Sequence, residues 1–74
     1  MEAKLKSIFS KSLGIDESLV TDHLSYAEIP QWDSVAHMAL MAAIEEGFDI
    51  MLDTEDVIDI SSFEKSKQII AKYL

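Results

Sequence analysis

Ser34 is the residue with the clearest capacity for chemistry, because it follows Asp33 where an apolar helix is expected to start. Pro30 restricts the residue before it and cannot lie inside a helix, so that helix should begin after it. Aspartate and serine both cap helices by accepting hydrogen bonds from the free N–H groups of the first turn. Those N–H groups and the helix dipole also favour an anion. Ser34 is therefore placed either to hold a phosphate ester or simply to cap the helix.

The residues around Ser34 resemble the acyl carrier protein family. In that family Asp-Ser-Leu opens the second helix and Leu-Glu-Glu-x-Phe-x-Ile closes it. The corresponding stretches here are Asp33-Ser34-Val35 and Ile-Glu-Glu-Gly-Phe-Asp-Ile at residues 44–50. The order and spacing of helices extend the resemblance over nearly the whole chain. It implies that Ser34, with Asp33 beside it, carries a 4′-phosphopantetheine arm from coenzyme A, which supplies the thiol that this cysteine-free chain lacks.

The resemblance implies a stand-alone carrier that presents a thioester-linked acyl group to other proteins and is not itself an enzyme. The implied partners are a phosphopantetheinyl transferase and acyl-loading and acyl-transfer enzymes with basic docking patches. Ala36 and Ala39 stand where many carriers of fatty acid synthesis have acids, so the sequence leaves the cargo and the pathway open. Two alternatives remain: a peptidyl or aminoacyl carrier of the same fold, and a small acidic helical interaction domain in which Ser34 only caps a helix.

Partner contacts are expected on the helix that follows Ser34. Its apolar residues cover more than one side, so one side can line the core while another meets a partner. Apolar positions near the helix start and acids near its end are the predicted partner-binding residues: Val35, Met38, Glu45 and Glu46.

His37 lies one turn after Ser34, on the same side of the helix. A serine hydrolase also needs a group that orients the base and an oxyanion hole, for which a helix surface in a small domain has little room. We therefore predict no catalytic residue, and we expect His37 to be exposed and to contact the arm or a partner. His23 and His37 lack metal-ligand spacing, and the acids at residues 49–59 lack the register of a calcium loop, so no metal site is predicted.

Charge is distributed unevenly along the chain, whose net charge is −8. All the lysines lie near the two ends, and all 14 acids except Glu2 lie between Ser12 and Glu64, where no basic residue occurs. Such a chain would repel nucleic acid but suits basic patches on partner enzymes, although the acids could equally serve only solubility. Because like charges resist ionisation, we expect some carboxyl pKa values to rise.

Apolar spacing predicts an all-α fold: one domain over residues 1–74, a small four-helix bundle of acyl-carrier type with three longer helices and a short third one. The first helix is expected at Glu2–Leu13 before Gly14, and the second at Ser34–Glu46, ended by Gly47. The short third helix should follow an Asp53 cap, with Val57, Ile58 and Ile60 pointing inward. The fourth should follow a capping box in which Ser61 and Glu64 are three residues apart.

The connection at residues 15–33 is long for so small a domain and should be an ordered loop. Its apolar residues are expected to anchor it to the bundle: Ile15, Leu19, Val20, Leu24, Tyr26 and Ile29. We also predict that Trp32 is an anchor rather than a partner contact. The chain has no cysteine and no long apolar run at its start, so we expect no disulfide, signal peptide or membrane insertion, and a monomer in the cytoplasm.

Overall fold

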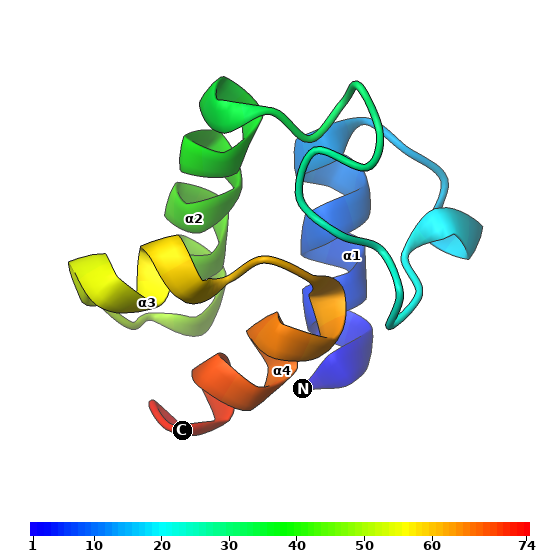
Figure 1. Ribbon diagram of the computed structural model, residues 1–74. Coiled ribbons are helices and arrows are strands. Elements are labelled where there is room, and N and C mark those ends of the chain that lie inside the picture. Colours follow the sequence, from blue (N-terminus) through cyan, green and yellow to red (C-terminus); the bar gives the residue numbers. More distant parts are fainter.

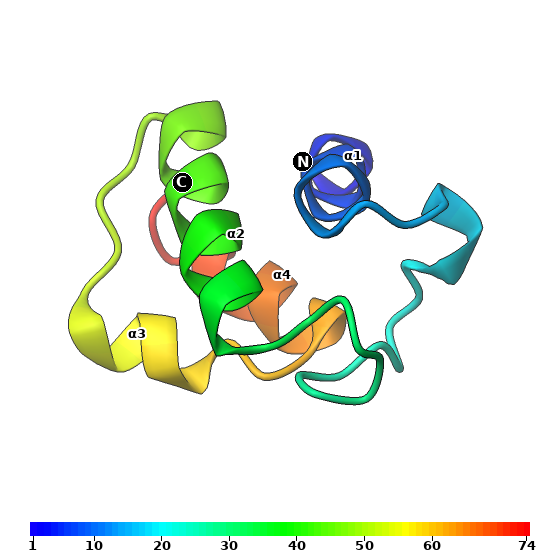
Figure 2. The ribbon, with the colours of Figure 1, turned by 90° about the horizontal axis from the view of Figure 1, so that it is seen from above.

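Helices α1 (Glu2–Leu13) and α2 (Ser34–Phe48) stand side by side and run in opposite directions (Figure 1). The computed structural model describes all of residues 1–74. Helix α4 (Phe63–Ala71) runs obliquely across the lower half of this pair, and the short helix α3 (Thr54–Asp59) lies in front of the lower part of α2 (Figures 1 and 2). A 3₁₀ turn at Glu17–Leu19 interrupts the connection between α1 and α2. The predicted all-α fold with one short third helix is confirmed.

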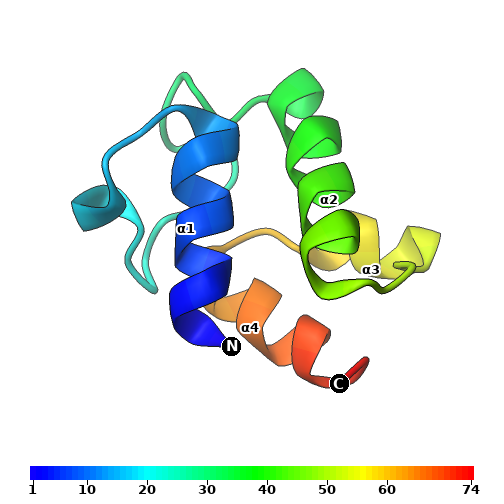
Figure 3. The same cartoon turned by 180° about the vertical axis from the view of Figure 1, so that it is seen from behind.

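Helix α1 has the predicted bounds, and its buried residues recur at every fourth position: Leu5, Phe9 and Leu13. Gly14 ends the helix in the left-handed conformation (φ 68°), as expected for the residue after a helix. Both chain ends lie at the lower end of the molecule, which the view from behind also shows (Figure 3).

Helix α2 does not end at Gly47, as the sequence predicted, but continues to Phe48. Asp49 closes it in the left-handed conformation (φ 54°), which aspartate tolerates better than most residues. Gly47 meets a different need, because a Cβ atom at this position would lie 2.6 Å from Cδ1 of Ile8. The glycine thus allows α1 and α2 to approach closely.

The short helix α3 follows Asp53 as predicted, although the Asp53 side chain makes no capping bond. Ile60 is buried and Val57 is partly buried, but Ile58 is 72% exposed. The prediction that Ile58 points inward was wrong. Successive residues of a helix point in different directions, and only one side of α3 faces the bundle.

Helix α4 begins one residue later than predicted. Ser62, not Ser61, is its N-cap, and the Ser62 Oγ accepts the N–H of Lys65 at 3.0 Å. Ser62 pairs with Ser25 in a short antiparallel bridge, and the Ser61 carbonyl accepts the N–H of Tyr26 at 2.8 Å. The backbone therefore stays extended through Ser62, and the helix begins at Phe63.

The connection before α2 is tied down by both apolar and backbone contacts. Ile15, Val20 and Leu24 are buried and Ile29 is partly buried, as predicted, but Leu19 (54%) and Tyr26 (41%) are exposed. The two exceptions have different positions: Leu19 lies on the outlying 3₁₀ turn, and Tyr26 borders a pocket. None of the helices has the length and the uninterrupted apolar stretch that crossing a lipid bilayer requires.

Candidate functional site

Ser34 is the first residue of α2, and it is exposed. Asp33 before it is the N-cap residue: its backbone is extended and its Oδ1 accepts the N–H of Ala36 at 2.8 Å. The predicted start of the helix is confirmed, and the structure divides the two tasks between the two residues. Asp33 makes the capping bond, which leaves the Ser34 hydroxyl facing solvent.

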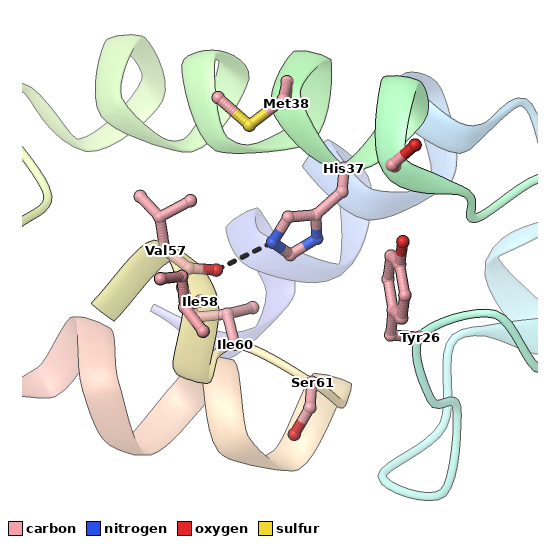
Figure 4. A pocket seen from close by; sticks show the side chains of 8 residues that line it. Tyr26, His37, Met38, Val57, Ile58, Ile60 and Ser61 are labelled. Atoms are coloured by element: carbon pink, nitrogen blue, oxygen red, sulfur yellow. Dashed lines mark hydrogen bonds between the residues drawn. The ribbon is translucent and has the colours of Figure 1, made fainter. Parts of the chain in front are cut away.

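A pocket of about 340 Å³ opens beside Ser34, between α2, α3 and the connection that precedes α2. Figure 4 shows Met38 and His37 reaching it from α2, Val57 and Ile58 from α3, and Tyr26 from the connection. Five of the eight lining residues are hydrophobic, and the full set is Tyr26, Ser34, His37, Met38, Val57, Ile58, Ile60 and Ser61. The exposed serine thus stands at the edge of an apolar cavity.

His37 is not the exposed residue that the sequence predicted. The indole N–H of Trp32 donates to its Nδ1 at 3.0 Å, and its Nε2 lies 2.8 Å from the carbonyl oxygen of Val57 (Figure 4). Its ring lies edge to edge and nearly coplanar with the Trp32 ring (18° between planes, centroids 6.0 Å apart), and the Tyr26 ring meets it edge-on at 5.4 Å. Both ring nitrogens are therefore engaged with groups other than the Ser34 hydroxyl.

Trp32 is fully buried, which confirms its predicted role as an anchor. Its ring meets Phe9 of α1 edge-on at 5.4 Å, and Phe9 in turn meets Phe63 of α4 at 5.1 Å. Such edge-to-face pairs contribute beyond the area they bury. This row of aromatic rings connects the core of the bundle to His37 and the pocket wall.

The four predicted partner-binding residues differ in their surroundings. Val35 (78% exposed) and Met38 (60% exposed) present apolar side chains near Ser34, and Glu46 is exposed. Glu45 is only partly exposed, and its Oε2 accepts the N–H of Leu52 at 2.8 Å. Residue spacing alone does not reveal this difference, because Leu52 reaches Glu45 only when the chain turns back after α2.

Asp56 is the most buried charged residue of the chain and joins α3 to the end of α4. The Tyr73 hydroxyl donates to its Oδ2, and Lys72 Nζ lies 3.0 Å from its Oδ1. These two bonds hold the pKa of Asp56 below its usual range, and the bond from Tyr73 has the larger effect. The same bond to Asp56 raises the pKa of Tyr73. Sequence reasoning missed this cluster, and no group of three metal-ligating side chains gathers anywhere in the structure.

Comparison with known proteins places the chain in a family. No family model matches it, but several curated proteins align over most of its length. An acyl carrier protein of Buchnera aphidicola subsp. Schizaphis graminum is 35% identical over 66 residues, covering 89% of this chain and 84% of the relative.

Two further acyl carrier proteins show similar agreement. One, from Buchnera aphidicola subsp. Baizongia pistaciae, is 31% identical over all 74 residues and 95% of its own length. The other, from Guillardia theta, is 32% identical over 69 residues, covering 93% of this chain and 85% of its own. With this identity over nearly its whole length, and with the four-helix fold already described, the chain belongs to the acyl carrier protein family.

Proposed function

We propose that the chain carries its acyl group on a 4′-phosphopantetheine arm attached to Ser34. The observation that carries this proposal is the division of tasks at the start of α2: Asp33 caps the helix, and the exposed Ser34 hydroxyl is left without a structural role. The family relationship supports the same reading, since acyl carrier proteins generally hold their cargo on this group. A serine needed as a cap would have to give up its capping bond on modification, and Ser34 has none to lose.

The surroundings of Ser34 fit such an arm. The hydroxyl is reachable from solvent, and the adjoining pocket offers apolar walls from Met38, Val57 and Ile58. When attached, the arm supplies the thiol on which an acyl group is held as a thioester. Because His37 has both ring nitrogens occupied, the chain offers Ser34 no base, so its activation falls to a separate phosphopantetheinyl transferase.

We further propose that partner enzymes dock on the exposed part of α2 next to Ser34. Val35 and Met38 supply apolar contact, and Glu46 supplies a negative charge for a basic patch. Complementary charge raises the rate of encounter more than the affinity. Glu45 contributes to this surface less directly, since its carboxylate is bound to the Leu52 N–H.

The attachment is tested by incubating the chain with coenzyme A and a phosphopantetheinyl transferase and measuring its mass. We expect the mass of one phosphopantetheinyl group to be added. Ser34→Ala should gain none and keep its helical circular dichroism, whereas Ser61→Ala, which alters another serine of the same pocket, should be modified normally. An unmodified wild-type chain would favour the interaction-domain alternative, and a modified Ser34→Ala variant would show that the site is elsewhere.

A further inference from the structure

The two contacts of His37 fix which of its nitrogens carries the proton. An indole N–H can only donate, so Nδ1, 3.0 Å from Trp32 Nε1, must be an unprotonated acceptor. A backbone carbonyl can only accept, so Nε2, 2.8 Å from the Val57 oxygen, must carry the proton. Only the neutral imidazole with its proton on Nε2 satisfies both bonds at once.

The Val57 carbonyl belongs to the last turn of α3, where carbonyl groups have no partner within the helix. The final backbone bond of α3 runs from the Ile60 N–H to the Asp56 carbonyl, one residue before Val57. His37 therefore caps the C-terminal end of α3 from α2, 20 residues earlier in the chain.

The other end of α3 is attached to a different helix. Tyr73 and Lys72, which follow α4, bind the Asp56 carboxylate, and the Tyr73 hydroxyl also accepts the N–H of Asp53 at 3.0 Å. Helix α3 is thus tied to the α4 segment near its start and to α2 through His37 near its end. The pocket lies between α2 and α3, beside the His37 bond (Figure 4).

We infer that His37 is a positioning residue that sets the width of this pocket by holding the end of α3 toward α2, and so limits the length of acyl chain that the pocket shelters. Without the His37 bond, the turn of α3 that holds the Val57 carbonyl loses its tie to α2 and shifts outward, while buried Ile60 and the Tyr26–Ser61 backbone bond keep the following residues in place. The buried Trp32 indole fixes the position of the His37 imidazole through the hydrogen bond to its Nδ1. The inference about acyl length rests on the proposed attachment at Ser34, whereas the role of His37 in holding α3 does not.

The first test uses the unmodified chain and nitrogen-resolved NMR of its two histidines. We expect His37 to show a single tautomer with a protonated Nε2 and an unprotonated Nδ1. A mixed or reversed tautomer at His37 would overturn the inference. This measurement needs no variant, so it stands even if a substitution at His37 prevents folding.

The second test measures amide hydrogen exchange in His37→Phe, which keeps an aromatic ring beside Trp32 but removes both nitrogens. We expect exchange at the Ile58 and Ile60 amides to accelerate at least about tenfold, with the amides of α1 unchanged. His37→Gln retains a donor and an acceptor and should restore part of the protection, and His23→Phe should match the wild type. Equal exchange in His37→Phe and wild type would refute the positioning role.

The third test loads the modified chain with saturated acyl groups of increasing length and follows thioester cleavage by hydroxylamine. In the wild-type protein, thioester cleavage should slow as the acyl group lengthens. Once the acyl group fills the pocket, further lengthening should change the cleavage rate little. In His37→Phe that limit should move to longer chains, and in His23→Phe it should not move. The same length profile in both proteins would overturn the inference on acyl length. Failure of Ser34 to be modified would instead reject the proposed function and leave the first two tests in force.

Discussion

The two sides of α2 are packed by different means. Toward α1 the contact is apolar and close. Leu40 and Ile44 are fully buried, and a Cβ atom at position 47 would lie only 2.6 Å from Cδ1 of Ile8. Toward α3 the helix borders a pocket of about 340 Å³ and is bridged by a single side-chain hydrogen bond, from His37 to the Val57 carbonyl. The first side has no space to bind anything, and the second keeps space open.

Typical magnitudes explain why the two sides serve different purposes. Full burial of a large apolar side chain contributes about 1.5–3 kcal/mol, whereas a hydrogen bond adds a net of about 0.5–1.5 kcal/mol. Stability therefore comes chiefly from the apolar core, to which α1, α2, α4 and the connection contribute, whereas the contact between α2 and α3 depends on one polar bond. A small domain that must both stay folded and admit a cargo benefits from keeping the two tasks apart.

The largest effect is expected from Phe9→Ala, in the apolar core. Phe9 is fully buried and touches the rings of Trp32 and Phe63, so its loss should cost about 3–5 kcal/mol of unfolding free energy. That is a large share of the stability of a domain of this size. Urea unfolding followed by circular dichroism measures it. Ile58→Ala, which alters an exposed side chain of α3, should change the free energy by less than about 0.5 kcal/mol, and equal losses would contradict the comparison.

A smaller effect is expected at the closest point between α1 and α2. Replacing a glycine inside a helix by alanine normally stabilises by about 1 kcal/mol, but the new Cβ of Gly47→Ala would stand 2.6 Å from Ile8 Cδ1. Ile8→Val removes that atom. We therefore expect Gly47→Ala to stabilise in the Ile8→Val background and not in the wild type, with a coupling of about 1 kcal/mol in a double-mutant cycle. Purely additive values would show that Ile8 moves aside without cost.

The attachment of α3 to α4 should be visible in the response to acid. Since the folded-state pKa of Asp56 is lowered, its contribution to stability is present above the ordinary carboxyl pKa of about 3.9 and is lost as pH falls through the folded value. The melting temperature of the wild type should therefore fall below about pH 4 more steeply than that of Asp56→Asn. Tyr73→Phe should weaken the acid response without abolishing it, because Lys72 remains. Parallel acid profiles for wild type and Asp56→Asn would exclude this cluster as the cause.

Local signals made much of the fold predictable from the sequence. Gly14 after α1 and Asp33 before α2 act on the residues next to them, and both boundaries were predicted correctly. The end of α2 and the start of α4 were misplaced because contacts between distant segments decide them. Ile8 lies against the glycine at position 47, and the pairing of Ser25 with Ser62 keeps the backbone extended through Ser62, so that α4 starts one residue later.

The candidate site was predictable only in part, for the same reason. The place of Ser34 follows from its neighbours, but the partners of His37 come from Trp32 and from α3, which folds back beside α2. Nothing in the spacing of the residues indicates that the Val57 carbonyl would lie there. An amphipathic pattern shows that a helix has a buried side, but not which atoms of a distant segment cover it.

The two carboxyl groups whose pKa shifts clearly move in the direction opposite to the expected rise. The pKa of Asp16 is lowered because its carboxylate accepts hydrogen bonds from Ser18. The pKa of Asp56 is lowered by its hydrogen bonds from Tyr73 and Lys72. Lysines that are distant in sequence also reach acids in the folded chain. Lys67 Nζ lies 2.6 Å from Asp22 and 3.4 Å from Glu2, and its pKa is raised chiefly by the hydrogen bond to Asp22. Counting charges along the chain could not reveal these pairs.

The smallest predicted effect separates Glu45 from Glu46, which are adjacent in sequence but differ in role. Glu46 is exposed on α2, so Glu46→Lys should slow loading by a partner enzyme a few-fold at low salt through lost electrostatic steering. The loss should shrink near 0.1 M salt, where charges are screened beyond about 10 Å.

Glu45→Gln leaves an acceptor for the Leu52 N–H and should change the loading rate less, whereas Glu45→Ala should lower the melting temperature by leaving that N–H unpaired. Loading rates and thermal melts of the three variants decide between the roles. An effect of Glu46→Lys that is equal at low and high salt would argue for a direct contact in place of steering, and a destabilised Glu46→Lys would mean that Glu46, like Glu45, supports the fold.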